Sequence, residues 1–204
     1  MTLTLRALLT KTLVNVVIAS AASVVLATPI AIANDNTQAV IDDFSDSVLA
    51  TTGHERQYLD DSLAGGGTTT KHTVESGVLH VTGELVPPRG QPGWASSVIP
   101  LNTVGLPFDA SAHTGIKLRL KVSKGNVSVS ANSTEVTNFD YHAVSVAVRA
   151  DGKFHEVTIP FSDMKRMWSE QTALNPKTLN SLSIVAYSMQ KAAFDFEVDD
   201  VRFY

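Results

Sequence analysis

Cysteine is absent from all 204 residues of the chain. Its absence excludes disulfide bonds, and it also excludes a lipid attached to cysteine at a leader cleavage site. A domain of this kind must therefore be held together by its hydrophobic core, with or without a bound metal ion.

Positive charge is also scarce. The chain has 16 lysine and arginine residues against 20 aspartate and glutamate residues, for a formal net charge of −4, and the basic residues are scattered. Binding to nucleic acid or to an anionic membrane surface requires a concentrated basic surface. We therefore expect no nucleic-acid partner.

Long hydrophobic runs are missing except near the N-terminus. There Arg6 and Lys11 precede an apolar stretch that ends in Ala31-Ile32-Ala33, a small-x-small cleavage pattern, and no acidic residue interrupts it. Asn15 and Pro29 break the stretch, which favours a signal peptide over a retained membrane anchor. We predict a signal peptide over residues 1–33, a periplasmic or extracellular location, and no stable membrane insertion of the mature chain.

The rest of the chain has the size of one ordinary domain. We predict a short disordered segment over residues 34–40 and a folded domain over residues 41–204. Helical periodicity is nearly absent from this domain, apart from one helical turn over residues 163–168 with Ser162 as its cap.

Alternation of apolar and polar residues dominates instead. Ile116, Leu118 and Leu120 alternate with charged residues, which is typical of a half-buried strand. Gly125-Asn126 and Asp151-Gly152 follow such strands and predict two β-hairpins. With about eight to ten short strands, the sequence predicts an all-β, two-sheet sandwich or jelly roll.

The most unusual segment covers residues 58–70, YLDDSLAGGGTTT. It joins paired acids, three consecutive glycines and a threonine run immediately before a strand pattern. Such a glycine run indicates a left-handed turn or a close approach of the backbone to another group, with a flexible loop as the alternative.

This segment carries a family resemblance. The run from Asp61 to Thr68 resembles the Asp-x-Val-Met-Gly-Gly-x-Ser signature of the complex I intermediate-associated protein 30 family. Residues 92–96 (PGWAS), residues 159–163 (IPFSD) and the ending FDFEVDDVRF resemble further motifs of that family, in the same order. The resemblance implies a galactose-binding-like jelly roll related to carbohydrate-binding modules.

Two pairs of acids lie near the ends of the predicted domain, at positions 42–43 and 199–200. The terminal strands of a sandwich often lie side by side, so these acids either face water separately or share a hard cation such as calcium. The resemblance to carbohydrate-binding modules implies a structural calcium held by Asp43 and Asp199, with Ser45 nearby.

Aromatic residues make up only 7% of the chain, so their positions are informative. Sugar recognition combines an aromatic platform with polar groups that fix the orientation of the ring. Trp94 is either such a platform or an anchor of the core, whereas Trp168, flanked by methionines, is expected to pack under the short helical turn. The predicted ligand-binding residues are Tyr58, Asp60, Asp61, Gly65, Gly66, Arg89 and Trp94.

Catalytic motifs are missing. The sequence has no Gly-x-Ser-x-Gly, no histidine pair with metal-ligand spacing, and no phosphate-binding loop, since the glycine run lacks the following lysine. We therefore expect a protein that is not an enzyme. A remote hydrolase would require two carboxyl groups facing each other across a deep groove.

These observations favour an exported binding module that holds a saccharide or similar polar ligand in its rim loops. The alternative, implied by the family resemblance, is an assembly or scaffold factor that binds a protein partner. Apart from the implied calcium, we expect no cofactor.

Overall fold

The computed structural model describes residues 39–204. The predicted signal peptide lies outside the described residues, as does the segment predicted to be disordered, apart from its last two residues. Val40 is the first residue of β1, so the domain has begun at that position. The part of the chain described here has no helix long and apolar enough to cross a membrane.

The domain is built from strands, as the alternation of the sequence predicts. Three short 3-10 helices connect some of them: η1 (Asp61–Ala64), η2 (Phe161–Asp163) and η3 (Pro176–Thr178). The strands are β1 (Val40–Asp42), β2 (Gln57–Asp60), β3 (Thr69–Glu75), β4 (Val78–Leu85), β5 (Gly93–Pro100), β6 (Gly115–Lys124), β7 (Asn126–Ser133), β8 (His142–Val146), β9 (His155–Pro160), β10 (Lys165–Arg166), β11 (Leu179–Ser188) and β12 (Ala192–Phe203).

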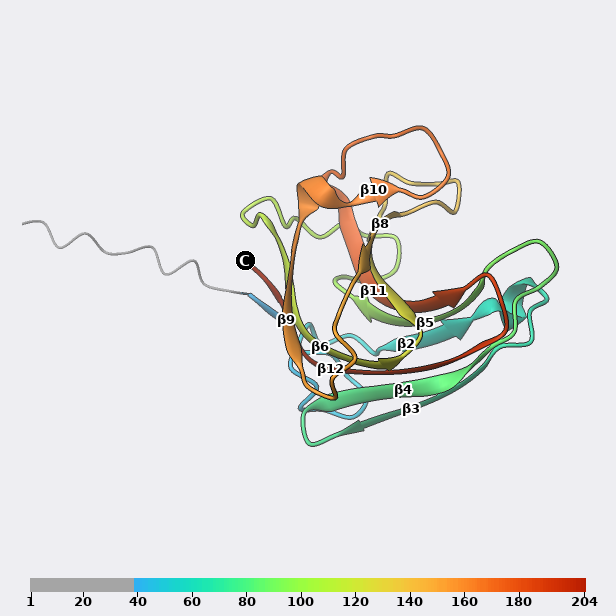
Figure 1. The fold of residues 1–204 in the computed structure, drawn as a ribbon. Helices are drawn as coiled ribbons and strands as arrows, with labels where there is room; N and C mark the ends of the chain where they lie inside the picture. The colour runs from blue at the N-terminus through green and yellow to red at the C-terminus, as the bar shows by residue number, and fades with distance from the viewer. Residues whose placement is uncertain (1–38) are drawn as a thin grey trace, which may run out of the picture. The chain divides into compact units, whose positions relative to one another are not determined.

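Two antiparallel sheets form two layers. The first has the order β3-β4-β12-β6-β9, with β1 added beside β12, and the second has the order β10-β8-β7-β11-β5-β2. Figure 1 shows β3, β4 and β12 as one layer, with β2, β5 and β11 in the layer above it. The predicted all-β, two-sheet sandwich is confirmed, and so is the placement of the two terminal strands side by side.

The core lies between these layers. Alternate residues of each strand point inward, so Leu118 and Leu120 of β6 are buried together with Phe196 of β12, as are Leu182 and Ile184 of β11. The remaining residues of each strand face outward, and the chemical character of these outward residues differs between the two sheets.

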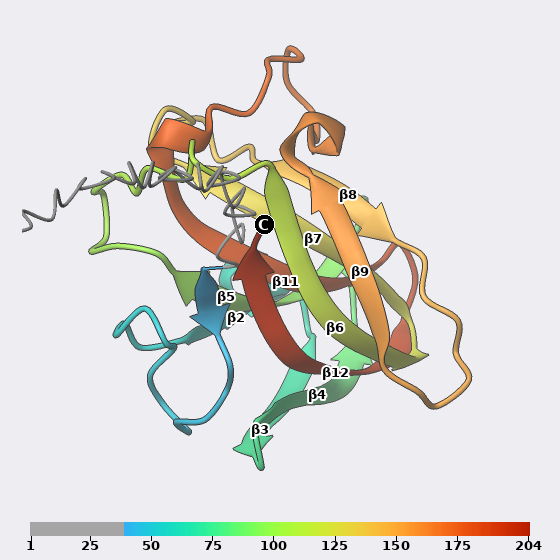
Figure 2. The same ribbon diagram turned by 90° about the vertical axis from the view of Figure 1, so that its left-hand side faces the viewer.

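The outward side of the first sheet carries paired charges. Lys121 contacts Glu197 at 2.5 Å, Lys117 lies 3.7 Å from Glu156, and Arg119 is paired with Asp199. Figure 2 shows the strands that carry these residues, β12, β6 and β9, side by side at the front. Because each of these cations faces an acid, this surface is a solvated face rather than a basic patch.

Both predicted hairpins are wrong. β6 pairs with β12 and β9, whereas β7, which follows it after Gly125, pairs with β11 and β8 in the other sheet. The same holds for β8 and β9 on either side of Gly152. These turns therefore carry the chain from one sheet to the other, as in a jelly roll.

The predicted helical turn over residues 163–168 is also wrong. η2 ends at Asp163, and the chain then becomes extended in β10, which pairs with β8. This pairing turns the residues after β10 away from the core and toward the outer face of the second sheet.

Candidate functional site

A groove of about 660 Å³ lies on the outward face of the second sheet. The alternation that buries Leu182 and Ile184 turns Ser181, Ser183 and Val185 of β11 into this groove. Its floor crosses four neighbouring strands, β2, β5, β11 and β7, which span about 14 Å at the usual strand spacing. The lining residues are Gln57, Leu59, Gln91, Pro92, Trp94, Ser96, Val98, Ser130, Asn132, Phe139, Tyr141, Trp168, Ser181, Ser183 and Val185.

Aromatic side chains gather at this groove. Trp94 projects from the floor, where β5 begins, and its indole is only half-buried. Phe139, Tyr141 and Trp168 come from the loops before β8 and after β10, and we call these three residues the aromatic lip. The rings of Tyr141 and Trp168 meet edge to face, with their centroids 5.3 Å apart.

The lip stands clear of the core. Phe139 is 94% exposed and Trp168 is 60% exposed, so the prediction that Trp168 packs under a helical turn is wrong. Phe139 also has a left-handed backbone, with φ at +62°, which is unfavourable for an aromatic residue. Exposed aromatic residues beside a groove, one of them with a strained backbone, indicate a ligand-contact surface.

Polar groups on the floor are hydroxyls and amides. The side-chain amide of Asn132 donates hydrogen bonds to Ser181 Oγ at 2.9 Å and to Ser183 Oγ at 3.0 Å, so these three side chains hold one another in place. No carboxylate, imidazole, ammonium or guanidinium group is among the lining residues of this groove. Its only titratable group is the Tyr141 phenol, whose pKa is raised by burial and by the nearby Asp140 charge.

A polar cluster behind the lip joins the two loops. Asp140 is buried and accepts hydrogen bonds from Arg166 Nε at 2.8 Å, from the Ser169 hydroxyl, and from backbone N–H groups of both loops. We call Asp140, Arg166 and Ser169 the clasp. Burial alone would raise the pKa of Asp140, but the hydrogen bonds from Ser169 and Arg166 outweigh it and hold that pKa well below its usual range.

The unusual glycine segment lies beneath Trp94. Asp61 is fully buried and accepts hydrogen bonds from the Thr68 hydroxyl at 2.8 Å, from the Thr68 N–H at 3.1 Å and from the Trp94 N–H at 3.2 Å. Gly66 has no room for a side chain, because a Cβ there would lie 2.1 Å from Asp61 Oδ1. The predicted close approach at the glycine run is thus present, and the group approached belongs to the protein itself.

The structure places only one of the seven predicted ligand-binding residues, Trp94, in the lining of the groove. Tyr58 points to the opposite face of β2 and stacks on His72 with ring centroids 3.5 Å apart. Asp60 caps η1 by accepting a hydrogen bond from Ser62 N–H, and Gly65 ends that helix with φ at +84°. Arg89 is exposed in the turn before β5 and does not line the groove.

The predicted calcium ligands are engaged elsewhere. Asp43 Oδ1 accepts hydrogen bonds from Ser45 Oγ at 2.7 Å and from Thr51 Oγ1 at 3.0 Å, and Asp199 is paired with Arg119. Between residues 39 and 204 no three acidic, histidine or cysteine side chains surround a common point. Asp200 Oδ1 is buried without a hydrogen-bond partner, but one orphan oxygen is far fewer than the six to eight that calcium takes. The donors do not fit a calcium ion, and that ion stays a prediction.

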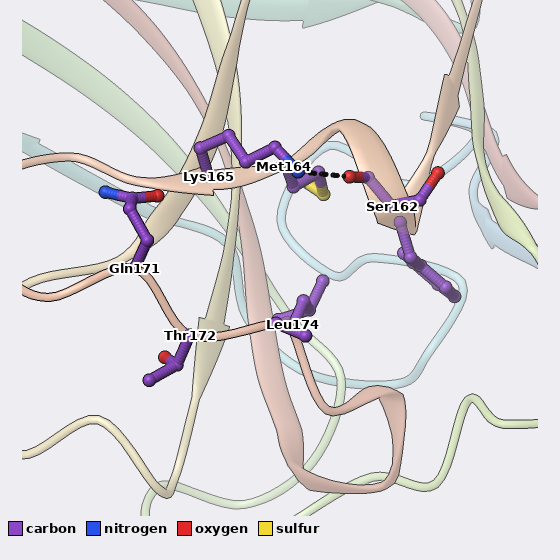
Figure 3. A pocket seen from close by; sticks show the side chains of 8 residues that line it. Ser162, Met164, Lys165, Gln171, Thr172 and Leu174 are labelled. Carbon is purple, nitrogen blue, oxygen red and sulfur yellow. Dashed lines mark hydrogen bonds between the residues drawn. The ribbon is translucent and has the colours of Figure 1, made fainter.

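A second cavity, of about 480 Å³, lies beside η2 and β10. Figure 3 shows Lys165, whose ammonium donates a hydrogen bond to the Ser162 carbonyl oxygen at 2.7 Å, with Gln171, Thr172 and Leu174 nearby. Its one cation is thus already engaged, and aromatic residues contribute only the buried Phe161. We regard the groove on the second sheet as the candidate site.

Most residues of the floor were not predicted from the sequence. Gln57, Ser96, Asn132, Ser181 and Ser183 occupy the outward positions of strands whose inward positions are mostly apolar. A signal was available, since these outward positions carry uncharged residues while those of β6 carry lysine and arginine. That difference distinguishes the two sheets before their pairing is known.

Comparison with solved structures finds the same fold in several carbohydrate-binding proteins. A family 11 carbohydrate-binding module from Clostridium thermocellum, solved with a β-1,3-1,4-mixed-linked tetrasaccharide, has 17% sequence identity and a TM-score of 0.60, covering 81% of this chain and 94% of the module. A family 30 carbohydrate-binding module has 13% identity and a TM-score of 0.55, covering 82% and 98%. An agarase has 9% identity and a TM-score of 0.56, with 81% of this chain matching 24% of the enzyme. These likenesses confirm the jelly-roll fold.

Comparison with the curated proteins finds no match. The sequence does match the profile of the complex I intermediate-associated protein 30 family over residues 43–198, which include η1, the glycine run and the whole candidate groove. The predicted resemblance is confirmed: the chain belongs to the complex I intermediate-associated protein 30 family.

Proposed function

We propose that this domain is an exported, non-catalytic binding module whose groove holds a neutral glycan chain. The observation that carries the proposal is the lining of the groove, where aromatic rings stand over hydroxyl and amide groups and no charged side chain is present. Sugar rings present apolar faces and hydroxyl edges, which match this combination of groups. The carbohydrate-binding modules of the same fold support this choice of ligand class.

The lack of carboxyl groups in the groove supports binding without cleavage. Glycoside hydrolysis by the common route needs two carboxyl groups about 5–9 Å apart on either side of the scissile bond. The groove has neither an aspartate nor a glutamate among its lining residues, so its residues offer no acid and base for that reaction. A floor crossing four strands also favours several sugar rings in a row over a single ring.

Replacing Trp94 with alanine tests this proposal. The mature domain is screened against a panel of soluble neutral and acidic polysaccharides, including mixed-linked β-glucan and agarose oligosaccharides, by calorimetry. Loss of a central aromatic contact typically costs about 2 kcal/mol, so we expect Trp94→Ala to weaken binding of a neutral glycan about 30-fold.

Phe154→Ala is the matched control, since Phe154 lies under Arg119 on the charged face of the other sheet. It should leave the affinity unchanged. Failure of every neutral glycan to bind, or equal affinity in wild type and Trp94→Ala, would contradict the proposal.

Glycan affinity should also be insensitive to pH between about 5 and 8. The Tyr141 phenol, the one titratable group in the lining, has its pKa raised above an already alkaline value. Because the pKa of Asp140 is lowered, its carboxylate stays ionised above the usual aspartate pKa. The hydrogen bonds that it accepts from the two loops are therefore lost only in strong acid. Calorimetry across this range checks the prediction, and a midpoint near pH 6.5 would instead indicate that a histidine takes part.

A protein partner is the second candidate function. The family name refers to an intermediate of complex I assembly, and the lip together with the half-exposed Met167 forms an apolar projection that a partner protein could cover. Crosslinking in the envelope fraction followed by co-purification separates the two functions. A stoichiometric protein that is lost in Phe139→Ser, together with no glycan binding, would favour the partner.

A further inference from the structure

We propose that Asp140 is a positioning residue whose clasp holds the aromatic lip in its ligand-binding arrangement. This inference rests on the proposed function, because it assigns the lip a role in gripping the same glycan chain. It concerns three residues, Asp140, Arg166 and Ser169, that do not line the groove.

The clasp ties together two loops that are far apart in sequence. Asp140 Oδ1 accepts hydrogen bonds from the Tyr141 N–H at 2.8 Å and from the Met167 N–H at 3.0 Å. Its other oxygen accepts from Arg166 Nε at 2.8 Å and from the Ser169 N–H at 3.1 Å. One buried carboxylate therefore fixes the backbone of both loops beside the residues of the lip.

Arg166 extends the connection. Its Nη2 donates hydrogen bonds to Asn138 Oδ1 at 3.0 Å and to Ser169 Oγ at 2.7 Å. Asn138 directly precedes Phe139, so the guanidinium links the two loops close to the residues of the lip. Figure 1 shows these loops next to each other, beside β10.

Buried and exposed residues lie next to each other in both loops. Asp140 is buried between Phe139 and Tyr141, and the exposed Met167 and Trp168 lie between Arg166 and Ser169, whose side chains both donate to Asp140. Because the rings of Phe139 and Trp168 are largely exposed, the core provides little packing to fix them. The clasp therefore restricts the movement of the two exposed loops and keeps the lip in place, including the strained backbone of Phe139.

A preformed lip matters for affinity rather than for folding. Both loops lie outside the sandwich core, and Arg166 is 11% exposed, against 2% for Arg56, so water reaches the guanidinium that remains when Asp140 is replaced. Immobilising three aromatic side chains during binding would cost conformational entropy for each of them, and a lip that is already ordered avoids that cost. The expected consequence of a broken clasp is weaker glycan binding by a protein that is still folded.

The experiment compares Asp140→Asn with Asp42→Asn. Asp42 forms the other buried aspartate–arginine pair, with Arg56, and lies in the first sheet away from the groove. Each variant is titrated by calorimetry with the neutral oligosaccharide that binds the wild type most tightly in the polysaccharide panel. Ser169→Ala provides a milder break of the clasp if Asp140→Asn folds poorly.

A second measurement needs no ligand. The chain has two tryptophans, so Trp168 is the only one left in a Trp94→Phe background. Acrylamide quenching of its fluorescence then reports how freely the loop moves, with and without the clasp.

We expect Asp140→Asn to weaken binding at least about tenfold and Ser169→Ala to weaken it less, both with increased quenching of Trp168. Asp42→Asn should lower the stability, because it leaves Arg56 buried without its partner, but it should leave the affinity and quenching of the folded protein unchanged. Wild-type affinity and quenching in both clasp variants, with binding still lost in Trp94→Ala, would overturn the role of the clasp alone. Absence of any glycan binding by the wild type would overturn the proposed function, and quenching would still decide whether the clasp orders the loops.

Discussion

Replacing Arg56 with methionine should lower the free energy of unfolding by about 3–5 kcal/mol, the usual cost of breaking a buried ion pair from one side. Arg56 Nε and Nη2 lie 2.6 Å and 2.7 Å from the two oxygens of Asp42, and the two side chains are 2% and 0% exposed. Without the guanidinium, the Asp42 carboxylate would remain buried with no compensating charge.

The consequences extend beyond one pair. Arg56 also donates a hydrogen bond to the Asp46 carbonyl oxygen at 3.0 Å and covers the ring of Phe44. Phe44 is buried with a left-handed backbone, φ +54°, and its N–H donates to Asp42 Oδ1. The pair thus fixes the loop between β1 and β2 as well as the end of the strand that joins β12.

Urea unfolding followed by tryptophan fluorescence measures the loss. The double variant Arg56→Met/Asp42→Leu should recover most of it, because replacing both charges with apolar groups removes the uncompensated carboxylate. A single variant that loses less than about 1 kcal/mol would show that water reaches Asp42 once the arginine is gone.

The acids that the sequence singled out are thus paired mainly with arginines. Asp42 binds Arg56, Asp199 is paired with Arg119, and Asp200 is paired with Arg202. The sequence predicted that the terminal strands lie side by side, and they do. It could not reveal which cation balances each acid, because Arg119 comes from a strand far from Asp199 in sequence and Arg56 reaches Asp42 only through the fold of the intervening loop.

Fold class could be predicted because period-two alternation is a local property of each strand. Strand partners could not, because alternation is the same whether the next strand pairs in the same sheet or crosses to the other one. Gly125 and Gly152 both adopt a left-handed backbone, as a tight turn requires, yet each turn leads to the opposite sheet. A glycine in a turn therefore predicts that the chain changes direction, but it does not predict which strand the next strand pairs with.

The site was harder still. Trp94 lies in β5 among small and apolar residues, so both faces of that strand look buried in the sequence and the choice between core and platform stayed open. Trp168 was expected to pack under a helical turn because Met164 and Met167 lie close to it in sequence. The pairing of β10 with β8 overrides that local pattern and turns the indole to the groove.

Replacing Gly66 with alanine should lower the free energy of unfolding by about 2–4 kcal/mol and also weaken glycan binding. The new Cβ would lie 2.1 Å from Asp61 Oδ1 and 2.2 Å from its Cγ, so the Asp61 side chain would have to move. Since Asp61 is fully buried, any such movement breaks its hydrogen bonds to Thr68 and to the Trp94 N–H.

Gly65→Ala separates this steric effect from the effect of losing a glycine. Gly65 has φ at +84° and open space where a Cβ would lie, so alanine there should cost only about 1 kcal/mol of backbone strain. It should leave Asp61 in place and glycan affinity unchanged.

Measuring both variants by urea unfolding and calorimetry tests whether the glycine run supports the site from beneath. A Gly66→Ala protein with reduced stability but wild-type affinity would show that the pairing of β5 with β11 keeps Trp94 in position without Asp61. Loss of both properties in Gly66→Ala alone would explain the acid followed by glycines in this segment: the carboxylate anchors the backbone of the platform tryptophan, and the glycine leaves room for that carboxylate.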